Sequence, residues 1–150
     1  MKIAFIGYGN MSSALVSGIL SSGKLNSSQD ITIFHNKNKS AFSLEECKFL
    51  ESGTECKDSF DIIFLCVKPK DIEVAINQNF NIFHDAQSIV SVVAGVNISS
   101  LKKLIKKNVS IVRAMPNLCA IYNESITGIS MSDGMNEEKG KYIEDIFRSI

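Results

Sequence analysis

Tryptophan is absent from this 150-residue sequence, and proline and histidine occur only twice each. The four cysteines, at positions 47, 56, 66 and 119, form no C-x-x-C pair and no other spacing typical of metal ligands. Because thiolates and imidazoles are the usual ligands of zinc, we expect no metal site. We also expect the cysteines to be reduced thiols of a cytoplasmic protein, since disulfides are rare in that compartment.

An excess of charge of either sign is also missing, because 16 lysines and arginines balance 16 aspartates and glutamates. A protein without a basic surface field is a poor candidate for binding nucleic acid or membrane. The lysines between positions 101 and 107 alternate with leucine and isoleucine, which indicates the solvated face of an amphipathic helix rather than a binding patch. No apolar run reaches the length of a membrane span, and no signal peptide precedes the first predicted strand. We therefore expect neither a nucleic-acid partner nor a membrane partner.

What the sequence does contain is a regular alternation of strand-like and helix-like stretches. The alternation predicts one α/β domain of the Rossmann type, a doubly wound, mostly parallel sheet with helices on both faces. Counted along the chain, the strands are expected in the spatial order 3-2-1-4-5. The predicted strands cover residues 2–6, 31–35, 61–67, 88–93 and 109–114, with 126–131 as a candidate sixth strand.

Helices are predicted between these strands. The first is stopped by Gly23, the second covers residues 41–50, and the third covers residues 71–76 before a polar loop. Ser99 or Ser100 is predicted to cap the lysine-rich helix, and an amphipathic helix ends the sequence.

The first predicted strand leads without a spacer into Gly7-Tyr-Gly9, and a helical pattern begins at once. This strand–turn–helix context is the one in which a G-x-G motif binds a dinucleotide. Gly7 permits the tight turn, and Gly9 lets a pyrophosphate approach backbone N–H groups at the start of the helix. The third position of the motif holds Ser12, which is small enough for close helix–strand packing and whose hydroxyl can bond a phosphate. An ordinary α/β turn without a ligand is the alternative interpretation.

The end of the second predicted strand bears on which dinucleotide is bound. NAD-binding folds usually place Asp or Glu there to hold the ribose 2′-OH, whereas this sequence has His35-Asn-Lys-Asn-Lys39. Lys37 and Lys39 stand where a 2′-phosphate would lie, and Asn36 can donate a hydrogen bond to it. The sequence therefore favours NADP(H), with NAD(H) as the alternative cofactor and a polar solvent loop as the alternative structure.

Four stretches share the order and spacing of motifs in a known enzyme family. They are Ile6-Gly-Tyr-Gly-Asn-Met11, Cys66-Val-Lys-Pro69, Ser91-Val-Val-Ala-Gly-Val96 and Arg113-Ala-Met-Pro-Asn117. Together they resemble the pyrroline-5-carboxylate reductases, the enzymes that make proline, and the resemblance covers essentially the whole chain. It implies that residues 1–150 are an NADP-binding domain and that the substrate is a cyclic imine carboxylate. It also implies homodimers or larger assemblies formed through a C-terminal helical domain, which these 150 residues lack.

The resemblance assigns the first stretch to the pyrophosphate turn and His35 and Lys37 to the adenosine ribose. It assigns the second stretch to a loop lining the cofactor, the third to the nicotinamide end, and the fourth to a Met-Pro-Asn turn. No catalytic residue is identified, because a protonated imine is already electrophilic and needs little general-acid machinery. The predicted cofactor-binding residues are Ile6, Gly7, Gly9, Asn10, Met11, Ser12, His35, Asn36, Lys37, Cys66, Val67, Lys68, Pro69, Val92, Val93, Ala94, Gly95 and Asn117.

Without the resemblance, several of these residues have simpler interpretations. Lys68 is then a surface lysine, Pro69 the end of a strand, and Asn117 part of an ordinary turn. The Ala94-Gly95 pair is likewise a tight exit from a strand.

The sequence also departs from the family pattern. Leu118-Cys119 replaces the usual Thr-Pro after Met-Pro-Asn, and the segment between Gly53 and Asp61 lacks the usual asparagine near the adenine. Two other function classes therefore stay open. One is another NADP-dependent reductase with a similar first domain, acting for example on hydroxy acids or a deazaflavin. The other is a non-catalytic nucleotide-binding module.

Overall fold

The computed structural model describes residues 1–21, 23, 27–36 and 47–150. Its strands are β1 (Ile3–Ile6), β2 (Ile31–His35), β3 (Lys48–Glu51), β4 (Ile62–Leu65), β5 (Ser88–Ser91), β6 (Ser110–Met115) and β7 (Gly128–Met131). Its helices are α1 (Asn10–Ser21), α2 (Ile72–Gln78), α3 (Phe80–Asp85), α4 (Ile98–Ile105) and α5 (Glu137–Phe147). Short 3-10 turns are η1 (Ser28–Asp30), η3 (Pro69–Asp71) and η4 (Leu118–Tyr122).

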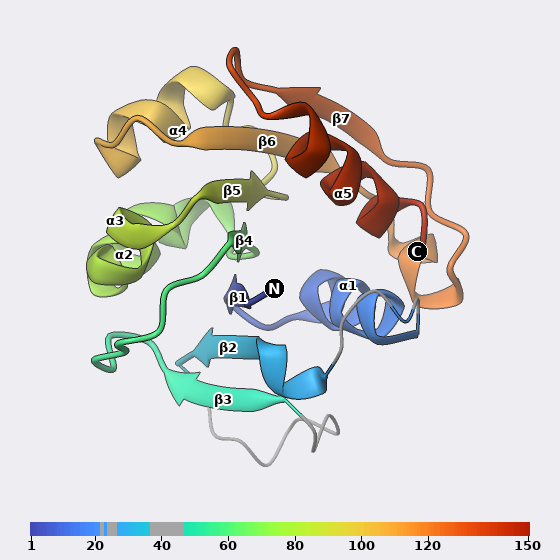
Figure 1. The fold of residues 1–150 in the computed structure, drawn as a ribbon, viewed down its shortest axis with the longest axis horizontal. Helices are drawn as coiled ribbons and strands as arrows, with labels where there is room; N and C mark the ends of the chain where they lie inside the picture. Colours follow the sequence, from blue (N-terminus) through green and yellow to red (C-terminus); the bar gives the residue numbers. More distant parts are fainter. Residues whose placement is uncertain (22, 24–26, 37–46) are drawn as a thin grey trace.

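The strands form a single sheet in the order β3-β2-β1-β4-β5-β6-β7. All neighbouring pairs are parallel except β6 and β7, which are antiparallel. Helices α1 and α5 cover one face, and α2, α3 and α4 cover the other (Figure 1). The predicted Rossmann-type, doubly wound fold is therefore confirmed, and the candidate sixth strand is present as β7.

The prediction of a helix over residues 41–50 is wrong at its end. Residues 48–50 belong to β3, which pairs with β2, while residues 41–46 of that prediction lie outside the described residues. The predicted spatial order made residues 61–67 the third strand, at the edge of the sheet, and this was wrong. These residues contain β4, which pairs with β1, and the third strand at the edge is β3. As an edge strand with Lys48 and Glu51 exposed, β3 lacks the continuous apolar run that marks a buried parallel strand.

Two details on the other face also differ from the predictions. Asn97, rather than either serine, caps α4, because its Oδ1 accepts the N–H of Ser100 at 2.8 Å. The segment predicted as a polar loop before β5 contains α3, which buries Ile82 and Phe83 under the sheet.

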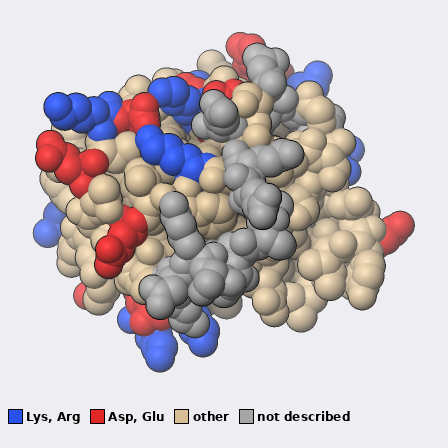
Figure 2. All heavy atoms as spheres, turned by 90° about the horizontal axis from the view of Figure 1, so that it is seen from below, with Lys and Arg blue, Asp and Glu red and all other residues tan. Residues whose placement is uncertain are grey.

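The lysine-rich helix α4 is amphipathic as predicted, with Leu101 and Ile105 buried. Its two lysines, Lys102 and Lys103, are exposed, as is Lys106 at the C-cap. Lys107 instead donates to the backbone carbonyls of His84 and Ala86, which joins this segment to the end of α3. On the face shown in Figure 2, the described basic and acidic side chains lie intermixed. Among the described residues, none of the helices combines the length and the apolar character that a membrane crossing demands.

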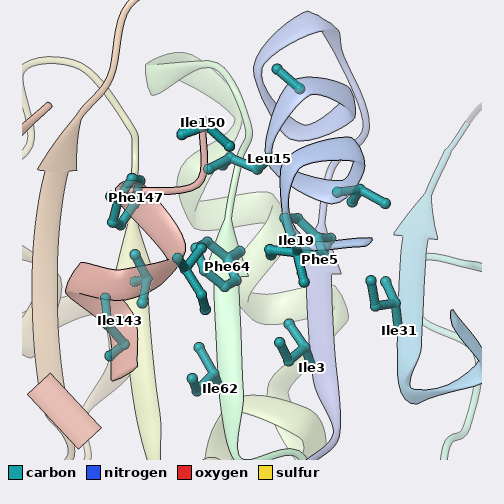
Figure 3. Packing of buried hydrophobic residues seen from close by; sticks show 14 of the residues in the cluster. Ile3, Phe5, Leu15, Ile19, Ile31, Ile62, Phe64, Ile143, Phe147 and Ile150 are labelled. Atoms are coloured by element: carbon teal, nitrogen blue, oxygen red, sulfur yellow. The ribbon is translucent and has the colours of Figure 1, made fainter. Parts of the chain in front are cut away.

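Helix α1 is held against the sheet by aromatic and aliphatic packing (Figure 3). Phe5 of β1 and Phe64 of β4 stack at 4.7 Å between ring centroids, and Phe147 of α5 lies 6.3 Å from Phe64. Leu15 and Ile19 of α1 are fully buried in the same cluster. This packing fixes the start of α1 at the carboxyl ends of the central strands.

A close contact between α1 and the last residues yields a stability prediction. A Cβ atom added to Gly18 would lie 2.0 Å from Cγ2 of the buried Ile150. We expect Gly18→Ala to lower the free energy of unfolding by about 1–3 kcal/mol, the usual cost of overpacking. This loss outweighs the roughly 1 kcal/mol that alanine gains in helix propensity.

Thermal and urea unfolding of Gly18→Ala would measure the effect. Ser17→Ala, at an exposed position of the same helix, is the matched control and should be neutral or stabilising. An unchanged or higher Tm for Gly18→Ala would contradict the packing described here.

Candidate functional site

The loops that follow β1, β2, β3 and β4 surround an open cleft of about 440 Å³ at the carboxyl edge of the sheet. Ligands of open α/β sheets bind at this edge, and the cavity has the size of a small-molecule site. Eight of the predicted residues line the cleft: Ile6, Gly7, Gly9, His35, Asn36, Cys66, Val67 and Lys68. Pro69 begins η3 directly beside them, whereas Lys37 lies outside the described residues.

The two glycines of the first turn are required for different reasons. Gly7 has φ of +91°, and a Cβ atom there would lie 2.8 Å from the carbonyl oxygen of Cys66. Gly9 has no positive φ, and a Cβ atom there would meet nothing within 4 Å. Gly7 is therefore needed by the fold, while Gly9 leaves open space above the start of α1.

The start of α1 offers unused backbone donors to that space. The carbonyl of Gly9 accepts the N–H of Ser13 at 2.9 Å, so Gly9 acts as the N-cap. The preceding N–H groups of the first turn, those of Asn10, Met11 and Ser12, have no acceptor within the helix. The first turn also contains no acidic residue, which leaves the positive end of the helix dipole available to an anion.

Ser12 supports the turn from inside. It is 1% exposed, as its predicted packing role requires. Its Oγ accepts the N–H of Gly9 at 2.7 Å and donates to the carbonyl of Gly9 at 3.0 Å. Because both hydrogen bonds stay within the turn, the structure gives no support to the predicted phosphate contact of this hydroxyl.

His35 anchors the same turn from the end of β2. Its Nδ1 accepts the N–H of Tyr8 at 3.2 Å, so the neutral ring carries its proton on Nε2. The Tyr8 ring packs edge-on against Phe49 of β3, with centroids 5.7 Å apart. Burial raises the pKa of the Tyr8 hydroxyl. Tyr8 thus links the turn to β2 and β3, a role the sequence analysis did not recognise.

The far wall of the cleft comes from η3 and α2, of which the sequence analysis assigned only Pro69 to the site. Asn36 Nδ2 donates to Oε1 of Gln78 at 3.4 Å and so joins the end of β2 to α2. The residues missed in this cleft are Tyr8, Ser52, Lys70, Asp71, Val74, Ala75 and Gln78. The helical spacing of Val74, Ala75 and Gln78, directly after the predicted Val-Lys-Pro stretch, is the signal that could have identified them.

Cys66 lines the cleft, but its thiol is poorly suited to act as a nucleophile. Burial raises the pKa of the Cys66 thiol, which disfavours the reactive thiolate. Cys119 is exposed in η4. Within the described ranges, no group of three or more His, Cys, Asp or Glu side chains is placed to hold a metal ion.

The predicted nicotinamide-side residues follow β5, at the same edge but outside this cleft. Val92 donates its N–H to the carbonyl of Leu65 at 3.2 Å, which joins the loop to β4. Val93 is buried, whereas Ala94 and Gly95 are exposed. Asn117 is exposed after β6, where its Oδ1 accepts the N–H of Cys119 at 3.0 Å and caps η4.

Comparison with known proteins gives a consistent result. A model of the family described as NADP oxidoreductase coenzyme F420-dependent matches residues 2–95. Pyrroline-5-carboxylate reductase 2 of Bacillus subtilis is 34% identical over 137 residues, which cover 87% of this chain and 48% of that protein. The pyrroline-5-carboxylate reductase of Escherichia coli is 30% identical over 149 residues, covering 98% of this chain and 55% of that protein.

A solved structure agrees with these relatives. The crystal structure of Plasmodium falciparum pyrroline carboxylate reductase with NADP bound matches with a TM-score of 0.84 at 26% identity. The match covers 99% of this chain and 55% of that one. The chain therefore spans about half the length of the proteins it matches.

The difference between the two turn glycines yields a binding prediction. We expect Gly9→Val to remain folded but to lose NADPH binding, because the added side chain fills the space above the N–H groups of α1. The substitution at the N-cap should cost no more than about 1 kcal/mol of stability.

Calorimetric titration with NADPH and thermal unfolding would measure the two effects. Gly7→Ala is the matched comparison and should instead destabilise the fold by roughly 1–3 kcal/mol, because it forces an unfavourable φ against Cys66. Retained NADPH affinity in a folded Gly9→Val protein would show that the ligand lies elsewhere.

Proposed function

The chain belongs to the family described as NADP oxidoreductase coenzyme F420-dependent, and on that premise we propose that residues 1–150 are the NADP-binding domain of a pyrroline-5-carboxylate reductase. The proposed reaction is the NADPH-dependent reduction of 1-pyrroline-5-carboxylate to proline. The proposal includes a cytoplasmic location and a small-molecule substrate as the partner of the site. It also includes assembly into homodimers or larger oligomers through a helical domain outside these residues.

The start of α1 is the observation that carries this proposal. Three backbone N–H groups at this helix start have no helical acceptor, a Cβ atom on the adjoining Gly9 would meet nothing within 4 Å, and the first turn holds no carboxylate to repel a phosphate. This arrangement fits the pyrophosphate of a dinucleotide. His35 and Asn36 at one side of the turn, and Cys66 to Lys68 at the other, are available for the adenosine half.

The extent of the similarity favours this reductase over the deazaflavin reductase that the family description suggests. The family match stops at residue 95, whereas the similarity to the Escherichia coli pyrroline-5-carboxylate reductase extends over 98% of the chain. The part beyond residue 95 contains the stretch Arg113-Ala-Met-Pro-Asn117, on which the resemblance partly depends.

The residues of this chain bind and orient rather than exchange protons. The chemistry that bound NADPH supplies is a hydride, which forms a C–H bond at the C=N carbon while the π electrons of that bond pass to the nitrogen. The turn at Gly7 and Gly9 would hold the pyrophosphate, and the loop after β5 would support the nicotinamide end. No described acid or base of the cleft is assigned a catalytic role, since a protonated imine is already electrophilic.

An exposed apolar rim lies beside the carboxyl edge. It supports the proposal that a further part of the protein covers the substrate side of the site. In the part of the chain that the structure describes, eight large apolar side chains are exposed, and five of them fall between positions 115 and 126. They are Met115, Leu118, Ile121, Tyr122 and Ile126, which is 83% exposed. An apolar patch of this kind indicates a surface that another element covers. We propose that the covering element is the helical domain and that it closes the substrate side of the site.

Cofactor choice provides the first test of the proposal. If Lys37 holds the 2′-phosphate, the protein should bind NADPH more tightly than NADH, and Lys37→Glu should reduce the preference by about tenfold or more, the scale of one charge-assisted contact. Titration of both cofactors into both proteins would measure this change. Lys103→Glu, on the exposed face of α4, is a control with the same charge change. Equal affinities for the two cofactors in the unmutated protein would contradict the assignment.

Turnover provides the second test. Residues 1–150 alone should bind NADPH but reduce pyrroline-5-carboxylate negligibly, because orientation of two reactants accounts for roughly 7–11 kcal/mol of a barrier and half of the site is supplied elsewhere. A fusion to the helical domain of the Bacillus subtilis relative should restore NADPH oxidation with this substrate. Comparable rates for the chain and the fusion would show that residues 1–150 form a complete active site. Binding of NADPH without turnover in a folded fusion would argue against this substrate.

A further inference from the structure

The loop between β5 and α4 is held by a side chain from the neighbouring strand. Arg113 of β6 is half-buried, and its Nε donates to the carbonyl oxygen of Val96 at 3.1 Å. We infer that Arg113 is a positioning residue that fixes this loop for the nicotinamide half of the cofactor. The inference rests on the proposed function, since it concerns the same dinucleotide site.

The register of the sheet explains why Arg113 can reach the loop. Arg113 pairs with Ser91, the last residue of β5, and its side chain shares the sheet face of Ile111, which packs beneath α4. Val96 lies five residues beyond Ser91, where the chain turns back toward α4. A long side chain at the level of the end of β5 can therefore reach the carbonyl of Val96 from the neighbouring strand.

The other anchors of the loop lie at its two ends. At the start, Val92 donates to the carbonyl of Leu65 at 3.2 Å and Val93 donates to Oγ of Ser91 at 3.3 Å. At the end, Asn97 caps α4. Between them, Ala94 and Gly95 are exposed, and Gly95 has φ of +75°. Arg113 adds a side-chain hydrogen bond that reaches this loop from the neighbouring strand β6.

The chemistry of arginine suits this role. The guanidinium is planar and charged, so a hydrogen bond from it to a carbonyl is stronger and more directional than one from a neutral donor. A lysine retains the charge but carries a single flexible ammonium, and a methionine retains the length but has no donor. Comparing arginine, lysine and methionine at position 113 therefore separates the effects of donor geometry, positive charge and side-chain bulk.

Two ligands distinguish positioning of this loop from general stability. NADPH contains the nicotinamide, whereas adenosine 2′,5′-bisphosphate carries the adenosine and 2′-phosphate without it. For Arg113→Met, we expect NADPH to bind about tenfold more weakly, the scale of one charge-assisted hydrogen bond, while the affinity for the bisphosphate stays unchanged. Arg113→Lys should give an intermediate loss for NADPH alone. Lys103→Met, which removes one positive charge from the exposed face of α4, should alter neither affinity.

The outcomes separate the inference from the proposed function. Equal weakening of both ligands by Arg113→Lys, or no weakening of NADPH by either Arg113 variant, would overturn the inference while leaving the NADP site intact. Failure of the unmutated protein to bind either ligand would overturn the proposed function as well. If Arg113→Met does not fold, the comparison of the two ligands in Arg113→Lys decides the inference by the same criterion.

Discussion

The geometry of the carboxyl edge depends on the close approach of the first turn to the loop after β4. Gly7 lies so near the Cys66 carbonyl that no Cβ atom fits between them. The approach is held on both sides, because Gly7 donates to the carbonyl of Phe34 and Cys66 donates to the carbonyl of Ile6, each at 2.9 Å. These contacts fix the turn relative to β2 and β4, and α1 starts directly after Gly9, which lines the cleft.

The two faces of the sheet support different parts of this edge. On one face, Phe5, Phe64 and Phe147 belong to the buried cluster that also contains residues of α1. On the other face, Asn36 reaches Gln78 of α2, and Arg113 reaches the loop before α4. The proposed pyrophosphate turn is thus supported by the layer of α1 and α5, and the proposed adenosine and nicotinamide ends by the layer of α2, α3 and α4. The apolar rim near η4 borders the same edge of the sheet.

Much of this arrangement could be predicted from the sequence because it depends on local patterns. The apolar runs of β1 and β4, the spacing of the glycines and the amphipathic α5 each carry their own signal. Strand β3 was missed because an edge strand with exposed ends has a weak pattern. Tyr8, Gln78 and the bond from Ser12 to Gly9 were missed for another reason. Their roles depend on contacts across elements, such as Tyr8 with His35 or Gln78 with Asn36, and no short-range pattern records which side chains meet there.

The central claim is that the open N–H groups at the start of α1 receive the pyrophosphate of NADPH. Titration of the 15N-labelled protein with NADPH, followed by two-dimensional NMR, tests this claim most directly. We expect large chemical-shift changes for the amides of Asn10, Met11 and Ser12, with further changes in the loops after β4 and β5. Unchanged amides at these three residues, with shifts confined to the opposite edge of the sheet around Asp61, would contradict it.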